Sequence, residues 1–230
     1  MALCFAAASS QYAELPSVYT DLLASTTNVT FTLWFRTTNG GTMPFLWSTK
    51  GAGTGKSFVE MNALLGFYFG TNGTFITSTG MTIVSDTWTH VALVRSSVTG
   101  KGEVWINGVK IYEATLPAHA SGTGTLYLGR YDSGLYLSGK LYDFQIHNAV
   151  LTKAQIRNIW AGNAVTTNRV ARWLMNETSG TTITDSVGGR NGTTFSTTWD
   201  TDAPTFGELD SSGGGVSRLI NGGLVRGQVL

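Results

Sequence analysis

Short stretches in which apolar and polar residues alternate recur along the whole chain. In the stretch VTFTLWFR (29–36), Val, Phe, Leu and Phe occupy every second position, as in a strand that buries one face. Shorter stretches of the same character predict further strands at 90–95, 125–129 and 140–147. The opening MALCFAAASS lacks the basic residues of a signal peptide and is predicted to form a first strand.

A tight turn is predicted at Asn107-Gly108, inside the stretch EVWINGVKIYE. Asn-Gly between two apolar runs is the strongest short-range signal for a β-hairpin, because a type I′ turn needs positive φ at both positions. The dipeptide occurs five times in the chain, which suits a chain that reverses direction often.

One helix is predicted, at residues 152–161 in the stretch LTKAQIRNIWAG. Thr152 is placed as the N-cap, and Gln155 is placed to complete a capping box. Leu151 and Ile156 have the spacing of a hydrophobic staple. So short a helix must pack against the sheets to be stable.

Composition agrees with a mostly β chain that folds as one sandwich. At 230 residues the chain has the length of one large all-β unit. Threonine is the commonest residue, ahead of the 29 glycines, and charged residues make up only 13%. A net charge of +1 gives no reason to expect nucleic acid or a membrane as partner, and no stretch is long enough to span a bilayer.

Four ordered stretches carry a family resemblance: FTLWFRT, WTHVALVR, VWINGVKI and LYLGRYDSGLYLSGKLYDFQIHNAVLTKAQIRNIW. From about residue 5 to 162, the chain resembles the laminin-G-like domains of the concanavalin A-like jelly-roll superfamily. The resemblance implies an all-β fold, a two-sheet antiparallel jelly-roll sandwich with one short helix. A block at 171–204 resembles a strand pair that more often opens such domains, and we interpret it as completing the same sandwich. The predicted domain is 1–207, followed by a Gly-rich tail, 208–230.

The family includes enzymes, so the sequence was searched for catalytic residues. Laminarinase-like relatives carry E-x-D-x-x-E on one strand, with the acids on one face. The nearest match is ELDSSG, where Glu208 and Asp210 are in register but Gly213 stands in the acid position. The three histidines lack metal-ligand spacing, and the single cysteine, Cys4, is expected to be a small core residue. The sequence therefore predicts no enzyme and no cofactor, calcium apart.

Binding residues are predicted mainly in the loop GRYDSGLY, between two strong strands. Tyr131, Asp132 and Tyr136 are the candidates there, and Trp34 is a further aromatic candidate for stacking on a sugar ring. Relatives often hold calcium near such loops, which makes Asp132 and Asp185 weak candidate ligands. The alternative for any single tryptophan is a place in the core.

The chain ends in SSGGGVSRLINGGLVRGQVL, a glycine stalk followed by an apolar segment. This tail is predicted to dock on another subunit by adding a strand or hairpin to an exposed sheet edge. The alternative is that the tail folds back on its own sandwich. The residues predicted to dock are Val216, Arg218, Leu219, Ile220, Leu224, Val225 and Arg226.

These features favour a non-catalytic structural or surface protein of a phage-like particle, as a capsid decoration or tail-associated protein that also binds glycans. Its expected partners are other copies of itself, a capsid or tail protein, and cell-surface glycans. The expected location is the virion, after synthesis in the host cytoplasm. The alternative is a free carbohydrate-binding lectin or adhesin at a bacterial cell surface or secreted, and a glycoside hydrolase ranks last.

Overall fold

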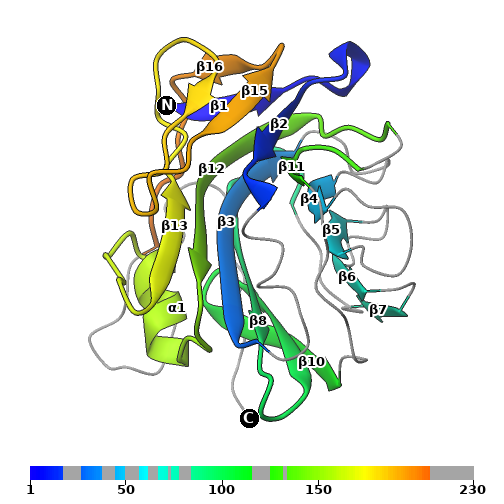
Figure 1. Ribbon diagram of the computed structural model, residues 1–230, viewed down its shortest axis with the longest axis vertical. Helices are drawn as coiled ribbons and strands as arrows, with labels where there is room; N and C mark the ends of the chain where they lie inside the picture. Colours follow the sequence, from blue (N-terminus) through cyan, green and yellow to red (C-terminus); the bar gives the residue numbers. More distant parts are fainter. Residues whose placement is uncertain are drawn as a thin grey trace.

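Two antiparallel sheets face each other in the computed structural model, and one short helix lies against the outer side of one of them (Figure 1). This arrangement confirms the predicted two-sheet sandwich. The structure describes residues 1–17, 27–37, 84–115, 125–131 and 134–207, together with the backbone of four strands between residues 45 and 77.

The first sheet, sheet A, has β3 (Val29–Thr37) and β12 (Gly139–His147) at its centre. On one side of β3 follow β8 (Thr89–Arg95), β9 (Lys101–Ile106) and β10 (Val109–Thr115). On the other side, β12 pairs with β1 (Ala2–Phe5) through its first residues and with β13 (Arg169–Trp173) through its last ones. β16 (Thr198–Asp200) pairs with β1 at the edge.

The second sheet, sheet B, runs in the order β14-β15-β2-β11-β4-β5-β6-β7. Its strands are β14 (Thr182–Ile183), β15 (Gly192–Phe195), β2 (Tyr12–Leu15), β11 (Leu126–Leu128), β4 (Phe45–Thr49), β5 (Ser57–Met61), β6 (Phe67–Thr71) and β7 (Thr74–Thr77). A 3-10 turn, η1 (Ala7–Ser9), joins β1 of sheet A to β2 of sheet B.

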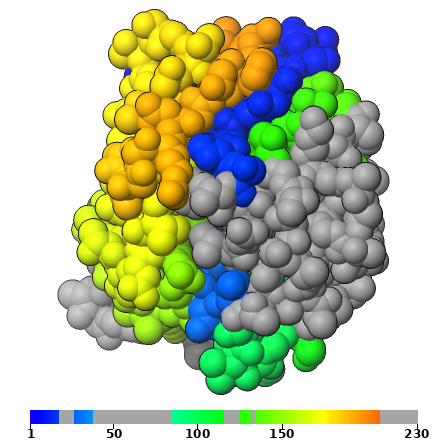
Figure 2. Space-filling model, viewed as in Figure 1, coloured from blue at the N-terminus to red at the C-terminus, as the bar shows by residue number. Residues whose placement is uncertain are grey.

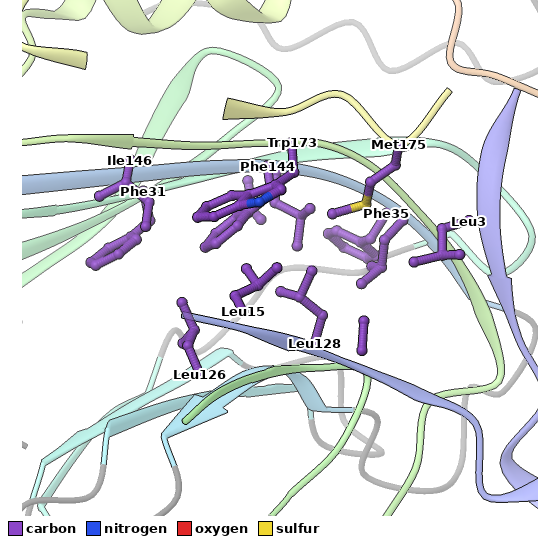
Figure 3. Close-up of a cluster of buried hydrophobic side chains, with 14 of the residues drawn as sticks. Leu3, Leu15, Phe31, Phe35, Leu126, Leu128, Phe144, Ile146, Trp173 and Met175 are labelled. Carbon is purple, nitrogen blue, oxygen red and sulfur yellow. The ribbon is translucent and has the colours of Figure 1, made fainter. Parts of the chain in front are cut away.

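The core lies between the two sheets (Figure 3). The Phe144 ring stacks on Phe31 at 6.2 Å and on Trp173 at 5.8 Å between ring centroids. Leu126 and Leu128 of sheet B meet these rings from the opposite side. The alternate residues of β3 that were predicted to point inward all belong to this core, so the period-two pattern is confirmed.

The predicted helix is present as α1 (Lys153–Trp160), with the capping box formed as expected. The Thr152 hydroxyl accepts from the Gln155 backbone N–H at 3.3 Å, and the Gln155 side chain accepts from the Thr152 N–H at 2.8 Å. Ile156 and Ile159 are buried in a second apolar cluster with Trp105 on the outer face of sheet A. The helix therefore covers the face of sheet A that turns away from the core.

The turn at Asn107-Gly108 joins β9 to β10, with φ of 47° and 75° at its two residues. Both values are positive, as a type I′ turn requires, so this prediction is also confirmed.

The block at 171–204 adds strands to both sheets of the same sandwich. β13 and β16 belong to sheet A, whereas β14 and β15 belong to sheet B. β15 pairs with β2 and β16 pairs with β1, so this block lies beside the first residues of the chain (Figure 2). The interpretation of these strands as part of one sandwich is confirmed.

Candidate functional site

The loop after β11 holds its aromatic residues in a fixed backbone conformation. Tyr131 N–H donates to Leu135 O at 2.8 Å, and Leu137 N–H donates to Gly129 O at 2.8 Å. Gly129 has φ of +70°, and a β-carbon there would lie 2.7 Å from the Phe5 ring, so only glycine fits. The loop thereby returns on itself and pairs Arg130 with Tyr136 as an isolated β-bridge.

Three aromatic rings surround the guanidinium of Arg130 and a fourth ring stacks on one of them, and we call this group the aromatic–arginine cluster. The Arg130 Cζ lies 4.6 Å from the ring centroid of Tyr12, 4.8 Å from that of Tyr127 and 5.8 Å from that of Tyr136. Tyr12 also stacks on Phe195, with centroids 4.5 Å apart and an interplanar angle of 10°. At these distances the cation interacts favourably with the faces of the tyrosine rings.

Strand alternation places this cluster on the face of sheet B that turns away from the core. Ala13 belongs to the core, so its neighbour Tyr12 points outward. The register pairs Phe195 directly with Tyr12, and β11 lies on the other side of β2. Tyr127 is almost fully buried beneath the other members, whereas Tyr12, Tyr136 and Phe195 are half-buried. The three half-buried rings and the guanidinium leave both apolar ring surface and polar groups within reach of a ligand.

A pocket of about 300 Å³ is lined in part by residues that follow the cluster closely in sequence. Ser138, two residues after Tyr136, lines it together with Phe5, Arg36 and Lys140. Two residues of extended chain span roughly 7 Å, so the pocket and the cluster lie at the same end of β12. Arg36 and Lys140 nevertheless point to the outer face of sheet A, whereas the cluster lies on the outer face of sheet B. We call this pocket the rim pocket.

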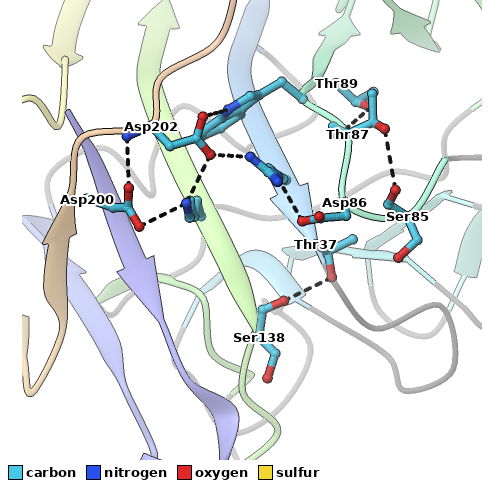
Figure 4. A network of polar contacts seen from close by, with 11 residues as sticks. Thr37, Ser85, Asp86, Thr87, Thr89, Ser138, Asp200 and Asp202 are labelled. Atoms are coloured by element: carbon cyan, nitrogen blue, oxygen red, sulfur yellow. Dashed lines mark hydrogen bonds and ion pairs between the residues drawn. The ribbon is translucent and has the colours of Figure 1, made fainter. Parts of the chain in front are cut away.

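An ion-pair network forms the charged wall of the rim pocket (Figure 4). Arg36 pairs with Asp86 at 2.8 Å and with Asp202, while Lys140 pairs with Asp200 and Asp202 at 2.9 Å each. The hydrogen bond from Arg36 holds the pKa of Asp86 below its ordinary value. The pKa of Asp202 is also lowered: burial opposes the shift, but hydrogen bonds and the charge of Lys140 outweigh it. These carboxylates are therefore ionised and paired at neutral pH.

The residues predicted for ligand binding lie in different environments. Tyr136 belongs to the aromatic–arginine cluster, and Tyr131 is half-buried in the adjoining loop, whereas Asp132 lies outside the described residues. Trp34 is only 2% exposed and points to the outer face of sheet A, with its ring 5.2 Å from His90 and 6.0 Å from Phe206. The prediction that Trp34 stacks on a ligand is wrong, because neighbouring side chains enclose its ring.

Asp185 has a structural role that accounts for its carboxylate. Its Oδ1 accepts the backbone N–H groups of Arg172, Val187 and Gly188 at 3.0 Å each, and its Oδ2 accepts that of Arg190 at 3.3 Å. Both oxygens are already committed, so the weak assignment of Asp185 as a calcium ligand is corrected. Within the residues that the structure describes, no three His, Cys, Asp or Glu side chains group as a metal site.

Two further sequence predictions concern the ends of the chain. Cys4 was expected in the core, but its side chain is half-exposed at the rim pocket, because its neighbours Leu3 and Phe5 are the residues that point inward. The predicted docking tail lies outside the described residues. In the described part of the chain, no helix is long and apolar enough to cross a membrane.

Sequence reasoning missed Tyr12, Arg130 and Phe195, which complete the cluster. Tyr12 and Phe195 are 183 positions apart in the numbering and meet only because β2 pairs with β15. The alternation in QYAELP was a usable signal for an outward Tyr12, but no local pattern indicates its partner.

Comparison with known families gives one match over most of the sandwich. A family model described as "Concanavalin A-like lectin/glucanases superfamily" matches residues 7–157. No curated protein matches the chain.

Solved structures with the same fold come from several organisms. A candidate carbohydrate binding protein from Bacteroides ovatus has a TM-score of 0.65 at 17% identity, over 86% of this chain and 58% of its own. Domain 4 of the extracellular GH43 arabinanase AbnA from Geobacillus stearothermophilus, in complex with arabinotriose, has a TM-score of 0.51 at 20% identity, over 64% and 70%. A heptameric SAP-like pentraxin from Limulus polyphemus has a TM-score of 0.50 at 17% identity, over 65% and 75%. At these identities the likeness is one of fold, and this chain spans little more than half of the Bacteroides protein.

Proposed function

Because the chain belongs to the concanavalin A-like lectin/glucanases superfamily, we propose that it is a non-catalytic carbohydrate-binding protein whose ligand contacts the aromatic–arginine cluster. The observation that carries this proposal is the arrangement of Tyr12 and Tyr136 around Arg130 on one outward face, with Phe195 stacked on Tyr12. A sugar ring has an apolar C–H face that packs on aromatic rings, and its hydroxyls accept hydrogen bonds from guanidinium N–H groups.

The rim pocket offers a second surface, separate from the cluster, because Arg36 and Lys140 point to the outer face of sheet A. Its volume of about 300 Å³ is at the lower end of the range for small-ligand pockets, ~300–1,000 Å³. Phe5 supplies an apolar wall, and Ser138, Arg36 and Lys140 supply polar groups.

Similar structures supply independent support of a coarser kind. The GH43 arabinanase domain was solved with arabinotriose, and the Bacteroides protein is a candidate for carbohydrate binding. These ligands belong to those proteins, and for this chain they support the class of ligand in the proposal.

Replacing Tyr12 and Tyr136 together by alanine should weaken glycan binding by at least about tenfold, because losing ~1.4 kcal/mol of stacking costs a factor of ten. A glycan array identifies the ligand, and isothermal titration calorimetry measures the change. Tyr112→Ala is the matched control, since Tyr112 is also half-buried but lies on β10 of sheet A. No array signal, or an equal loss in the control, would contradict the proposal.

Binding is favoured over glycoside hydrolysis by the state of the acidic groups near the rim pocket. A general acid needs a pKa raised towards neutrality, whereas the pKa values of Asp86, Asp200 and Asp202 are all lowered. The sequence candidates Glu208 and Asp210 lie outside the described residues.

Attachment to a phage-like particle is the finer part of the proposed function, and its basis is the sequence of the tail. In this proposal residues 208–230 hold the protein to another copy or to a capsid or tail protein, and the sandwich faces outward from the virion. Deleting residues 213–230 should leave the domain folded by circular dichroism and abolish oligomerisation or particle attachment in co-sedimentation. A truncated protein that still assembles would contradict the tail's role without affecting glycan binding.

A further inference from the structure

A second, smaller pocket lies on the outer face of sheet A, far in sequence from the proposed glycan surface. It is enclosed by β12, β13, the turn 162–164 after α1, and Phe206, and its volume is about 50 Å³. Three charged side chains line it, those of Asp143, Arg169 and Arg172. Charged side chains in so small a pocket need partners of opposite charge or hydrogen-bonding groups.

Asp143 and Arg172 neutralise each other in this pocket. Arg172 donates from Nε to Asp143 Oδ1 at 2.7 Å and from a terminal nitrogen to Oδ2 at 3.1 Å. Gln145 donates to Asp143 Oδ2 at 2.8 Å. Asp143 is 5% exposed and has φ of +51°, at an irregularity where β12 shifts its register against β3. The backbone thus adopts a costly conformation where it places this carboxylate between polar partners.

Arg169 is the cation that remains uncompensated. One of its terminal nitrogens donates to the side-chain oxygen Oε1 of Gln145 at 3.3 Å, and its Nε is buried with no hydrogen-bond partner in the described part of the chain. Burial and the nearby charge of Arg172 lower the pKa of Arg169, while Asp143 only partly opposes them. His147, the adjacent ring on β12, adds no negative charge, and its Nε2 is likewise buried without a partner among the described residues.

The balance of charge in this pocket is therefore positive. Two guanidiniums face one carboxylate, and the end of α1 contributes about half a negative charge. A planar guanidinium binds oxyanions through two parallel N–H groups. The volume holds about three waters, at ~10–15 Å³ each, and thus has room for a carboxylate group but not for a sugar ring.

We propose that this pocket binds a carboxylate-sized oxyanion between Arg169 and Arg172, with Phe206 at its mouth. The buried Nε of Arg169 donates to one oxygen, and the outward N–H groups of Arg172 donate to the other. Ile159 forms an apolar wall that excludes water from the contact, and Phe206, 42% exposed, borders the entrance. The ligand is either a free small anion or the carboxylate group of a longer molecule such as an acidic sugar.

The test is an NMR titration of the unmodified protein with sodium acetate at constant ionic strength, following the Nε–Hε signals of the arginines. We expect saturable shifts of the Arg169 and Arg172 signals, and acetate binding at least tenfold weaker in Arg169→Gln. Lys153→Gln removes an exposed cation from α1 outside the pocket and should bind acetate like the unmodified protein. Arg169→Lys, which keeps the charge without the planar fork, is the second variant if Arg169→Gln fails to fold.

A glucuronate arm distinguishes the two sources of the carboxylate. Competition between glucuronate and acetate supports a site for acidic sugars or similar molecules, and acetate binding alone supports a site for a free small anion. Shifts that grow linearly with acetate, or that persist unchanged in Arg169→Gln, would overturn the proposal. This pocket shares no residue with the aromatic–arginine cluster, so its failure leaves the proposed glycan site untouched.

Discussion

Replacing Asp185 by alanine is expected to lower the free energy of unfolding by roughly 4 kcal/mol, because four backbone N–H groups lose a charged acceptor worth ~1.5–3 kcal/mol each. The estimate is below the full sum since water can reach the turn at 187–190, which is exposed. Asp185 itself is 3% exposed, and one of its donors, Arg172 N–H, lies within β13. Urea unfolding at neutral pH measures the change.

Asp185→Asn is the matched control for this prediction. The asparagine oxygen can still accept the three N–H groups that Oδ1 accepts, but its amide group faces Arg190 N–H and cannot accept it. We expect about half the loss of the alanine variant, ~2 kcal/mol. Calcium or a chelator should change neither value. Destabilisation of the unmodified protein by a chelator, to the level of Asp185→Ala, would restore the calcium interpretation.

The protein is expected to lose about 2.5 kcal/mol of stability between pH 7 and about pH 4.5 through His90 alone. His90 is fully buried on the outer face of sheet A beside Trp34, and neither ring nitrogen has a hydrogen-bond partner in the described part of the chain. Burial lowers the pKa of His90 from 6.5 to about 3. Between about pH 6.5 and pH 3, His90 is therefore protonated in the unfolded chain but not in the folded protein. The free energy of unfolding decreases as the pH falls through this range. The pKa of His147 is also lowered by burial, so its contribution has the same sign.

His90→Leu keeps the side-chain volume and removes the titrating group. Its stability should be similar to or greater than that of the unmodified protein at pH 7, because no hydrogen bond of the ring is lost. Urea unfolding from pH 7 to pH 4 should give a curve for His90→Leu that falls by about 2.5 kcal/mol less at pH 4.5. Parallel curves for the two proteins would show that His90 is protonated in the folded state as readily as in the unfolded chain.

Interactions between residues close in sequence were sufficient to predict the helix cap and the hairpin turn. The capping box at Thr152 and Gln155 and the turn at Asn107-Gly108 each depend on residues within a few positions, and the structure has both as predicted. The alternation in β3 likewise identified the residues that face the core. In each case the free energy comes from bonds and packing that adjacent residues make with one another or with any apolar partner.

The same alternation could not say what covers the second face of a strand. Trp34 points away from the core as its position predicts, and that made it a candidate for a ligand. Phe206 and His90 enclose it instead, and Phe206 is 172 positions further along the numbering. Alternation with a period of two distinguishes the two faces of a strand. Whether the outer face is buried depends on a segment distant in sequence that packs against it.

By itself, the sequence determined the fold class, the capped helix α1, the hairpin and the place of Tyr136 in a loop between strong strands. Tertiary structure decided that Tyr12, with Phe195 stacked on it, joins Tyr136 around Arg130. It also decided that Asp185 binds backbone amides and that Arg169 and Arg172 line one small pocket. The physical reason is the range of the interactions. Turns, caps and alternation are stabilised within one short segment. The cluster on β2, β11 and β15 and the pocket on β12 and β13 exist only after strands distant in sequence have paired in register.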